Sequence, residues 1–513
     1  MVQIGRHHLF ADVKEVNEDN VVQIIKDVEP GFLANQQACD RLLLVEAGVM
    51  PLDREKIVRS DIDVQTVDPI AHEVTVFKEG YHWGNLINFV RRGVKDSGSE
   101  DENEGIALLN ECYAAENAGR KQRTLGHFVE ICGIGYTFVD IKSEWKDGDS
   151  YFELETLDPR FAFVVRSSLY ADHRVVLGVT FRQDNMGNKY YTAFTPKYRF
   201  EIKGETVVPA GEQVASTIVN PLGMIPIIEW ERSDDRMGVF EREIPEMKRL
   251  NLLLSDIGND VDQECQQIWH ANDVDFPVKK DENGNETDEV ETPRSNEWVT
   301  TYTSRDGKTP FIKPLATSYD YAGLLNNYTT ARAMILERTY TPQRNDNSGG
   351  STGTAMSDAT GWSAAEQVAC AQQLLMEASK MNEVKVALEA IRKSRKLTDD
   401  NALMKLRYMD LKPNVTRQKT YEMTVKTNAF ANLVSHGVNG LHALKAVNFF
   451  EDVAQVWTDS KDLIEQYQSK TFGEDKDVEK SSDLPEYQIT NSPLIDGMSK
   501  EAPNGTDVDR RTE

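Results

Sequence analysis

Apolar residues recur at steps of three and four over three long segments in the second half of the chain, the pattern of amphipathic helices. These segments are residues 242–270, 318–340 and 363–396. The same periodicity over residues 20–60 predicts a further helix, interrupted at Pro30. Each apolar stripe must be buried, either in a bundle within the chain or against neighbouring subunits. The periodicity alone leaves both arrangements open.

Between residues 128 and 230 the pattern changes to short runs of β-branched and aromatic residues separated by turn residues. Examples are YTFVDIKS, YFELETL, FAFVVRS and RVVLGVTFRQ. This region is predicted to form a mainly antiparallel sheet. Residues 273–316 predict a second, smaller β-rich region, with an acidic loop at Asn283–Asn285 and a hairpin turn at Asp306–Gly307. The predicted fold class is therefore α+β.

Two segments lack apolar periodicity. Residues 342–361, PQRNDNSGGSTGTAMSDATG, are polar and rich in glycine. This segment is longer than a simple connector in a compact domain, and its length favours a functional loop. Residues 473–513 are acidic with few apolar side chains, so we expect that tail to be disordered.

The chain is strongly acidic, with 84 Asp and Glu against 58 Lys and Arg and a formal net charge of −26. This composition disfavours a protein that grips nucleic acid through a basic face. It leaves open both a protein past which DNA slides without lodging and a protein indifferent to DNA. No apolar run is long enough for a membrane span, and the first 20 residues contain no apolar segment typical of a signal peptide. The five cysteines are scattered, as expected of reduced thiols in a cytoplasm.

No catalytic, cofactor or metal motif survives inspection. The glycine-rich loop has no lysine and so cannot be a phosphate-binding P-loop. Its GGSTG run matches the spacing of a serine nucleophile elbow but follows a polar segment, not a buried strand. The acidic segment at 281–292 lacks the glycine and the glutamate of a calcium loop, and the histidines lack metal-ligand spacing. We therefore expect no enzyme activity, no cofactor and no metal.

The order of segments resembles the portal proteins of tailed double-stranded DNA bacteriophages, in particular the siphovirus family typified by phages of Gram-positive hosts. The similarity spans about residues 30–470 and is strongest over 125–275. The runs that carry it are FVEICGIGYTFVDI (128–141), LDPRFAFVV (157–165), VVLGVTFRQ (175–183), NPLGMIPIIEW (220–230) and EREIPEMKRLNLLLSDIGNDVDQ (241–263).

The resemblance implies a ring of twelve subunits around a channel, each with wing, stem, clip and crown regions. The implied regions are the wing (1–241), stem helix 1 (242–270), clip (271–316), stem helix 2 (317–341), tunnel loop (342–361), long wing helix (362–396), crown (397–472) and acidic tail (473–513). The clip loop and the tail depart from the family pattern, which puts the details of partner docking there in doubt.

The implied function is genome packaging, retention and ejection through a channel at one capsid vertex. The implied partners are DNA contacted without sequence preference, terminase, head-completion or adaptor proteins, and the major capsid and scaffolding proteins, with no membrane. The protein would be assembled in the host cytoplasm and reside in the virion. The alternatives are another ring-forming head or tail protein or, less favoured, a packaging enzyme.

Two sets of residues are predicted to carry this function. The tunnel-loop residues expected to face DNA are Arg344, Asn345, Asn347, Ser348, Ser351 and Thr352. The residues expected to pack between subunits are Leu250, Leu254, Ile257, Val261, Leu375 and Leu388.

Overall fold

The computed structural model describes most of the chain up to residue 463. The described residues are 5–52, 63–92, 100–146, 148–204, 214–265, 269–272, 278–280, 286–290, 310–314, 320–343, 361–417, 423–447, 456–457, 460–461 and 463. They belong to two compact units, Met1–Thr420 and Tyr421–Glu513. In the second unit, helices α10 (Met423–Ser435) and α11 (Gly440–Val447) pack against each other.

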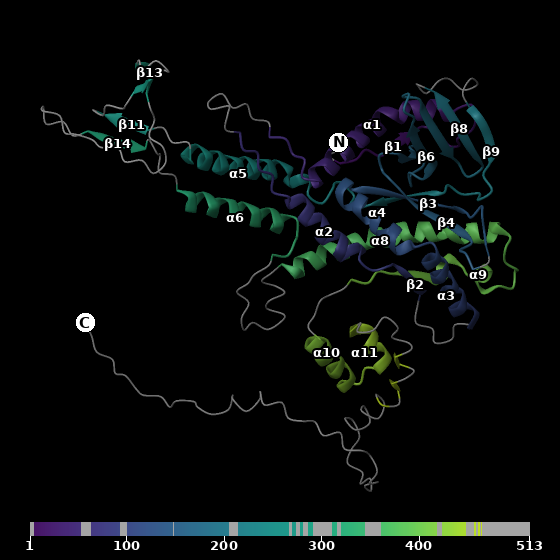
Figure 1. Cartoon of the computed structure of the whole chain (residues 1–513). Coiled ribbons are helices and arrows are strands. Elements are labelled where there is room, and N and C mark those ends of the chain that lie inside the picture. Colours follow the sequence, from purple (N-terminus) through teal and green to yellow (C-terminus); the bar gives the residue numbers. More distant parts are fainter. Residues whose placement is uncertain are drawn as a thin grey trace, which may run out of the picture. The chain divides into compact units, whose positions relative to one another are not determined.

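Small sheets and long helices alternate along the first unit, which confirms the predicted α+β fold (Figure 1). The larger sheet has the strand order β1-β5-β6-β7-β8-β9. Its strands are β1 (Leu9–Ala11), β5 (Ala162–Ser167), β6 (Val175–Gln183), β7 (Lys189–Phe194), β8 (Tyr198–Gly204) and β9 (Val214–Val219). β1 pairs parallel with β5 and every other pair is antiparallel. None of the described helices is both long and apolar enough to span a membrane.

Helix α1 (Val21–Glu46) covers this sheet and corrects one sequence prediction. Its first half packs on the strands, with the Phe32 ring 4.5 Å from the Phe163 ring. The helix continues through Pro30, where an interruption was predicted. A proline inside a helix removes one backbone hydrogen bond and costs about 3 kcal/mol. The buried valine, isoleucine and phenylalanine stripe offsets that cost, since each fully buried aliphatic or aromatic side chain contributes about 1.5–3 kcal/mol.

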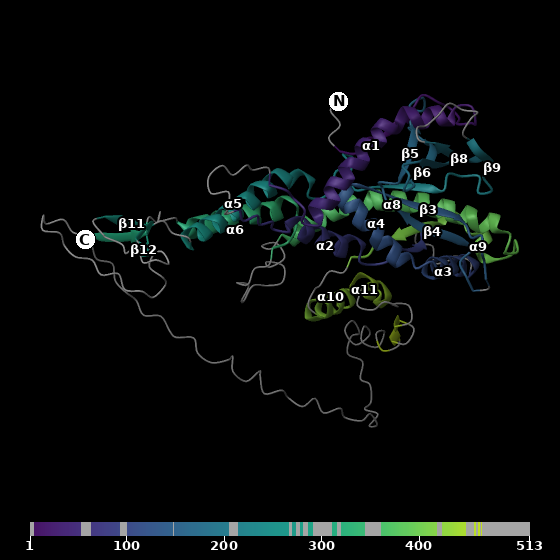
Figure 2. The same ribbon diagram turned by 45° about the horizontal axis from the view of Figure 1, so that its top comes forward.

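The smaller sheet lies among helices. Its order is β10-β3-β4, formed by β10 (Ile227–Glu231), β3 (Ile134–Ile141) and β4 (Phe152–Leu157). Helices α4 (Ala118–Cys132) and α8 (Trp362–Ser394) pack against β3 (Figure 2). Gly133 lets the chain turn from α4 into β3, because its φ of +78° lies in the left-handed region that favours glycine.

Further elements surround this sheet. They are α2 (Ile70–Trp83), β2 (Asn88–Arg91), α3 (Glu100–Ala115), α9 (Ala402–Lys405), the short 3₁₀ helix η2 (Tyr408–Asp410) and β15 (Leu411–Asn414), which pairs with β2. Apolar side chains of α3, α4, α8 and the small sheet form one core. A second core joins α1, α2 and β3 to two later helices described below.

The apolar stripe expected on α8 is buried in the second half of the helix but not in the first. Val384, Leu388 and Ile391 are buried, whereas Ala371 and Ala378 on the same stripe are exposed. The face that is buried includes Gln372, Lys380 and Glu383. Lys380 Nζ lies 2.6 Å from a Glu383 oxygen, and the Thr137 hydroxyl donates to Glu383 at 3.1 Å. Lys380 and Glu383 thus balance each other's charge, which lowers the cost of burying them.

The buried carboxylate of Glu130 on α4 joins four parts of the chain. Its Oε1 accepts hydrogen bonds from His82 Nδ1 (2.9 Å) and Trp83 Nε1 (3.0 Å) on α2 and from Gln372 Nε2 (2.7 Å) on α8. Its Oε2 accepts from Arg232 Nε at 3.1 Å, just after β10. Burial by itself would raise the pKa of Glu130, but His82 and Arg232 beside it hold that pKa well below its ordinary value.

Replacing Glu130 with Gln should destabilise the fold by about 3–5 kcal/mol, because Arg232 and His82 lose their buried counter-charge. Urea unfolding followed by tryptophan fluorescence measures this loss of stability. The matched control is Glu155→Gln, at a half-exposed ion pair, which should cost less than about 1 kcal/mol. Because folding lowers the Glu130 pKa, its contribution should be complete above the ordinary glutamate pKa and be lost progressively on acidification below it. Equal stability of the two variants would contradict the central role of Glu130.

Candidate functional site

The two predicted helices that flank the small β-rich region form an antiparallel pair. They are α5 (Ile244–Cys265), preceded by the 3₁₀ turn η1 (Glu241–Glu243), and α6 (Tyr321–Arg338). Asp320 caps the start of α6 by accepting a hydrogen bond from the Gly323 amide at 2.9 Å. The start of α5 and the end of α6 enter the same core, through Leu250 and Ile335 among others. The two helices run side by side away from that core (Figures 1 and 2).

Short strands follow α5 and precede α6. β11 (Trp269–Asn272) pairs antiparallel with β14 (Phe311–Pro314), and β12 (Val278–Lys280) pairs antiparallel with β13 (Glu286–Val290). They confirm that the segment between the two helices contains β-structure. The predicted acidic loop at 283–285 and the turn at Asp306–Gly307 lie outside the described residues.

A row of polar side chains on α5 holds the extended segment at residues 63–69. Asn259 Oδ1, Ser255 Oγ and Asn251 Oδ1 accept hydrogen bonds from the amides of Val64, Thr66 and Asp68, at 2.8, 3.0 and 3.0 Å. The spacing is matched, because four residues of helix rise about 6 Å and two residues of extended chain about 6.6 Å. The sequence prediction missed this row, although its steps of four residues are visible in the sequence.

The same segment is tied to α6. The Tyr328 hydroxyl donates to Asp68 Oδ2 at 2.6 Å, and Arg332 Nε donates to the same oxygen at 3.2 Å. Arg332 also pairs with Glu73 on α2. Burial and the Asp68 charge raise the pKa of Tyr328 to about 12, so its hydroxyl remains a donor at neutral pH. The segment therefore fastens α5 and α6 to each other and to α2.

The residues expected to pack between subunits occupy different environments within the chain. Leu250 and Leu388 are buried in the chain's own cores, and Leu254 is half-buried against the core that receives α5. Ile257 and Leu375 are half-buried, and Val261 is 45% exposed. A side chain buried in its own chain has little surface left for a neighbour. Subunit packing therefore stays a prediction that rests most directly on Val261, Ile257 and Leu375.

The six residues expected to face DNA, between Arg344 and Thr352, lie outside the described residues. The residues on either side of them are described. On one side, Gln343 Nε2 donates to the Ala333 carbonyl of α6 at 3.0 Å. On the other, Gly361 precedes α8 with a φ of +85°. The DNA-facing role of these six residues remains a prediction.

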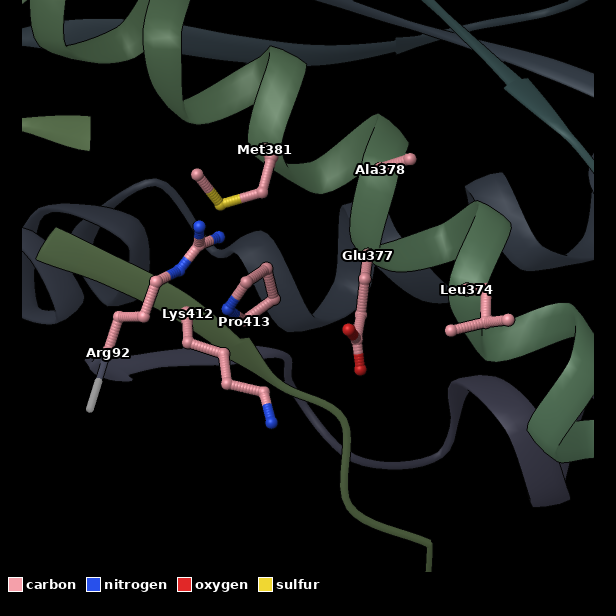
Figure 3. Close-up of a pocket in the computed structure, with 7 residues that line it drawn as sticks. All are labelled: Arg92, Leu374, Glu377, Ala378, Met381, Lys412 and Pro413. Carbon is pink, nitrogen blue, oxygen red and sulfur yellow. The ribbon is translucent and has the colours of Figure 1, made fainter. Parts of the chain in front are cut away.

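A pocket of about 350 Å³ lies between α8 and the β2–β15 pair (Figure 3). Arg92 and Lys412 line it from the β2–β15 side, and Glu377 and Met381 from α8. Leu374, Ala378 and Pro413 complete the lining. It is a shallow recess in which cationic, anionic and apolar groups are mixed, so it does not select one class of ligand.

His8, Glu229 and Glu231 place ligand-type atoms close enough to hold a metal ion, but the charges around them disfavour a cation. Arg236 donates to both carboxylates, at 2.9 Å for Glu229, and Arg166 donates to Glu229 at 2.6 Å. Burial and the Arg236 charge lower the pKa of His8 to about 4. The two carboxylates are thus balanced by two guanidinium groups, and this cluster is better explained as a structural ion-pair network.

Changing Ser255 to Ala removes the hydroxyl that accepts from the Thr66 amide. The loss of one hydrogen bond of about 1 kcal/mol should speed amide exchange in residues 63–69 about fivefold. Hydrogen–deuterium exchange of the purified protein measures this, with Asp262→Ala, at an exposed position on the same helix, as the control. Unchanged exchange in the Ser255 variant would show that the polar row does not hold the segment.

The family model "Phage portal protein, SPP1 Gp6-like" matches residues 63–470. A chain in the structure "Neck of empty GTA particle computed with C6 symmetry" aligns with a TM-score of 0.40 and 13% identity, covering 78% of this chain and 90% of that one. A search of curated proteins found no match. The family match extends over most of the sequence, and the chain belongs to the SPP1 Gp6-like family of phage portal proteins.

Proposed function

We propose that twelve copies of this portal protein surround the channel through which the genome enters and leaves a phage capsid. The observation that carries this proposal is the order of elements: a paired α5 and α6 with short strands between them, then the polar segment 344–360 and the long helix α8. Membership of the portal family makes the chain a ring-forming component of the virion. The number of subunits and the assignment of each part are our proposal.

In this arrangement, the sheets and helices of residues 1–241 form the wing, and α5 and α6 form the stem. The segment 271–316, with its short strands, forms the clip. The polar segment 342–361 is the tunnel loop, residues 362–396 the long wing helix and residues 397–472 the crown. The packing of α5 and α6 on the wing core supports the assignment, because among the described residues one end of the helix pair enters that core.

DNA passage fits the charge of the chain. A ring of subunits, each with a formal charge of −26, repels phosphates and leaves few sites at which DNA could lodge. Arg344 is the only basic residue of the polar segment 344–360. One arginine per subunit gives several weak contacts to the phosphate backbone around the ring, and such contacts carry no sequence preference.

The clip and the wing are the proposed docking surfaces for partners. We propose that terminase and head-completion proteins bind at the clip, and that capsid and scaffolding proteins contact the wing during assembly in the host cytoplasm. The chain itself is proposed to have no catalytic role. Terminase would supply the work of packaging by ATP hydrolysis, because the sequence contains no phosphate-binding P-loop.

Native mass spectrometry of the purified protein should detect a ring of twelve subunits. Val261→Asp places a charge on the exposed side of α5, and it should prevent ring formation while the monomer stays folded, because burying an unpaired charge between subunits is costly. Met186→Asp, at an apolar residue that is 88% exposed in the β6–β7 turn, is the control and should leave the ring intact. Rings of unchanged size from the Val261 variant would exclude α5 packing at this position.

Changing Arg344 to Glu should leave ring assembly unchanged and reduce the amount of DNA packaged or retained, because a phosphate contact becomes a repulsion in every subunit. Packaging assays with procapsids and terminase measure this effect. Arg344→Lys keeps the positive charge and should package nearly as well as the unaltered protein. Full-length packaging by the Glu variant would argue that residue 344 does not face DNA.

A further inference from the structure

Helix α2 contacts both ends of the segment that joins α6 to α8. At the first end, Lys78 is fully buried, and its Nζ donates a hydrogen bond to the Tyr340 carbonyl at 3.1 Å. At the second end, the Trp362 ring lies edge-on to Phe77 and Tyr81, with ring centres 5.6 Å apart in each case. Phe77, Lys78 and Tyr81 lie within about one turn of α2.

The end of α6 needs this support. Tyr340 has a φ of +53°, in the left-handed region that favours glycine and costs other residues about 1 kcal/mol or more. The turn is closed by hydrogen bonds from the amide of Tyr340 to the Glu337 carbonyl and from the amide of Thr341 to the Leu336 carbonyl. Lys78 adds a cation next to the carbonyl groups that end α6, where the helix dipole favours positive charge.

The start of α8 is held by a second set of contacts. The Tyr81 hydroxyl donates to Glu366, one turn into α8. Arg417 pairs with Glu366 at 3.0 Å and donates to Gln373 at 2.8 Å, which extends the attachment by two further turns. Phe77 and Tyr81 stack on each other with ring centres 5.5 Å apart, so they form one aromatic surface for Trp362.

The turn of α2 that makes these contacts is itself fixed. The next two residues, His82 and Trp83, donate to the buried Glu130 carboxylate. The contacts to Tyr340 and Trp362 therefore connect the residues on either side of the segment 344–360 to the buried Glu130 carboxylate.

We propose that residues Phe77–Tyr81 of α2 are the mount that sets the positions from which the segment 344–360 leaves α6 and enters α8, with Lys78 and Trp362 as positioning residues. The functional meaning of this mount rests on the proposed role of that segment as the DNA-facing loop. The mount itself rests on described contacts alone. It implies that changes in α2, outside the loop, alter how the ring handles DNA.

Lys78→Met keeps the shape of the side chain and removes its charge and donor. We expect amide exchange in residues 339–343 to become roughly tenfold faster, with little change at 362–370. Global stability against urea should not fall, because a buried charge is also removed. Val76→Ala, on the same turn but at a half-exposed residue, is the control. Unchanged exchange at 339–343 would overturn the proposal for Lys78.

Trp362→Leu tests the contacts at the start of α8. This variant should still fold, because the Trp362 side chain is 37% exposed. Exchange should become faster in the first turns of α8 and stay unchanged at 339–343. Protection equal to that of the unaltered protein would show that the aromatic contact does not hold α8.

The charge of Lys78 provides a separate readout. Burial lowers the pKa of Lys78 to about 8. The nearby Glu130 charge opposes this shift, and the Arg232 charge adds to it. Above that pH the lysine loses its proton in the folded state and the attraction to the end of α6 is lost. Exchange at 339–343, corrected for its intrinsic pH dependence, should therefore increase between about pH 7 and 9 in the unaltered protein and not in Lys78→Met. The same profile in both proteins would exclude the charge as the holding force.

Packaging separates the mount from the function assigned to the loop. If Lys78→Met speeds exchange at 339–343 and lowers the amount of DNA packaged, both proposals are supported. If exchange changes and packaging is normal, the mount stands and the DNA-facing role of the loop fails. If exchange does not change, the mount fails whatever the packaging result.

Discussion

The buried carboxylate of Glu130 is the constraint on which the rest of the first unit depends. A buried charge is tolerated only when it is paired and hydrogen-bonded, so its donors must all be present together. They come from α2, α8 and the residue after β10, while Glu130 itself belongs to α4. Four segments far apart in the sequence thus have one relative arrangement that satisfies this group. The end of the small sheet's strand β10, the long helix α8 and the last turn of α2 all meet at this carboxylate.

The elements with regular apolar patterns were predictable, and those that depend on buried polar groups were not. Periodicity located α5, α6 and α8, and short runs of β-branched and aromatic residues located the sheet region between residues 128 and 230, but not β1. Periodicity did not predict the polar part of the buried face of α8. Gln372, Lys380 and Glu383 are of residue types that usually lie at the surface. Their partners, Glu130 and Thr137, are more than 240 residues away, and no local pattern reveals such a pairing.

In the candidate site, too, the order of elements was predictable and the burial of individual side chains was not. The order of helix, β-segment, helix, polar segment and helix was visible in the sequence, and it carried the resemblance to portal proteins. The sequence could not say which part of an apolar stripe is buried within the chain. Leu250 and Leu388 belong to the chain's own cores, whereas Val261 remains exposed. The row Asn251, Ser255 and Asn259 was overlooked because polar side chains on a helix were taken as solvent-facing.

The helix pair α5 and α6, the proposed stem, has a consequence for assembly. Among the described residues, the first half of α5 and the second half of α6 enter a core of their own chain, and the other halves carry exposed apolar residues such as Val261 and Leu325. The halves outside that core gain little packing from their own chain, and tertiary packing supplies most helical stability. The polar row Asn251–Asn259 extends the attachment of α5 into its second half, and in the proposed ring the exposed apolar residues would be buried by other subunits. In a portal ring, the stem would therefore become fully stable as the ring closes, which couples the order of the channel wall to the completeness of the ring.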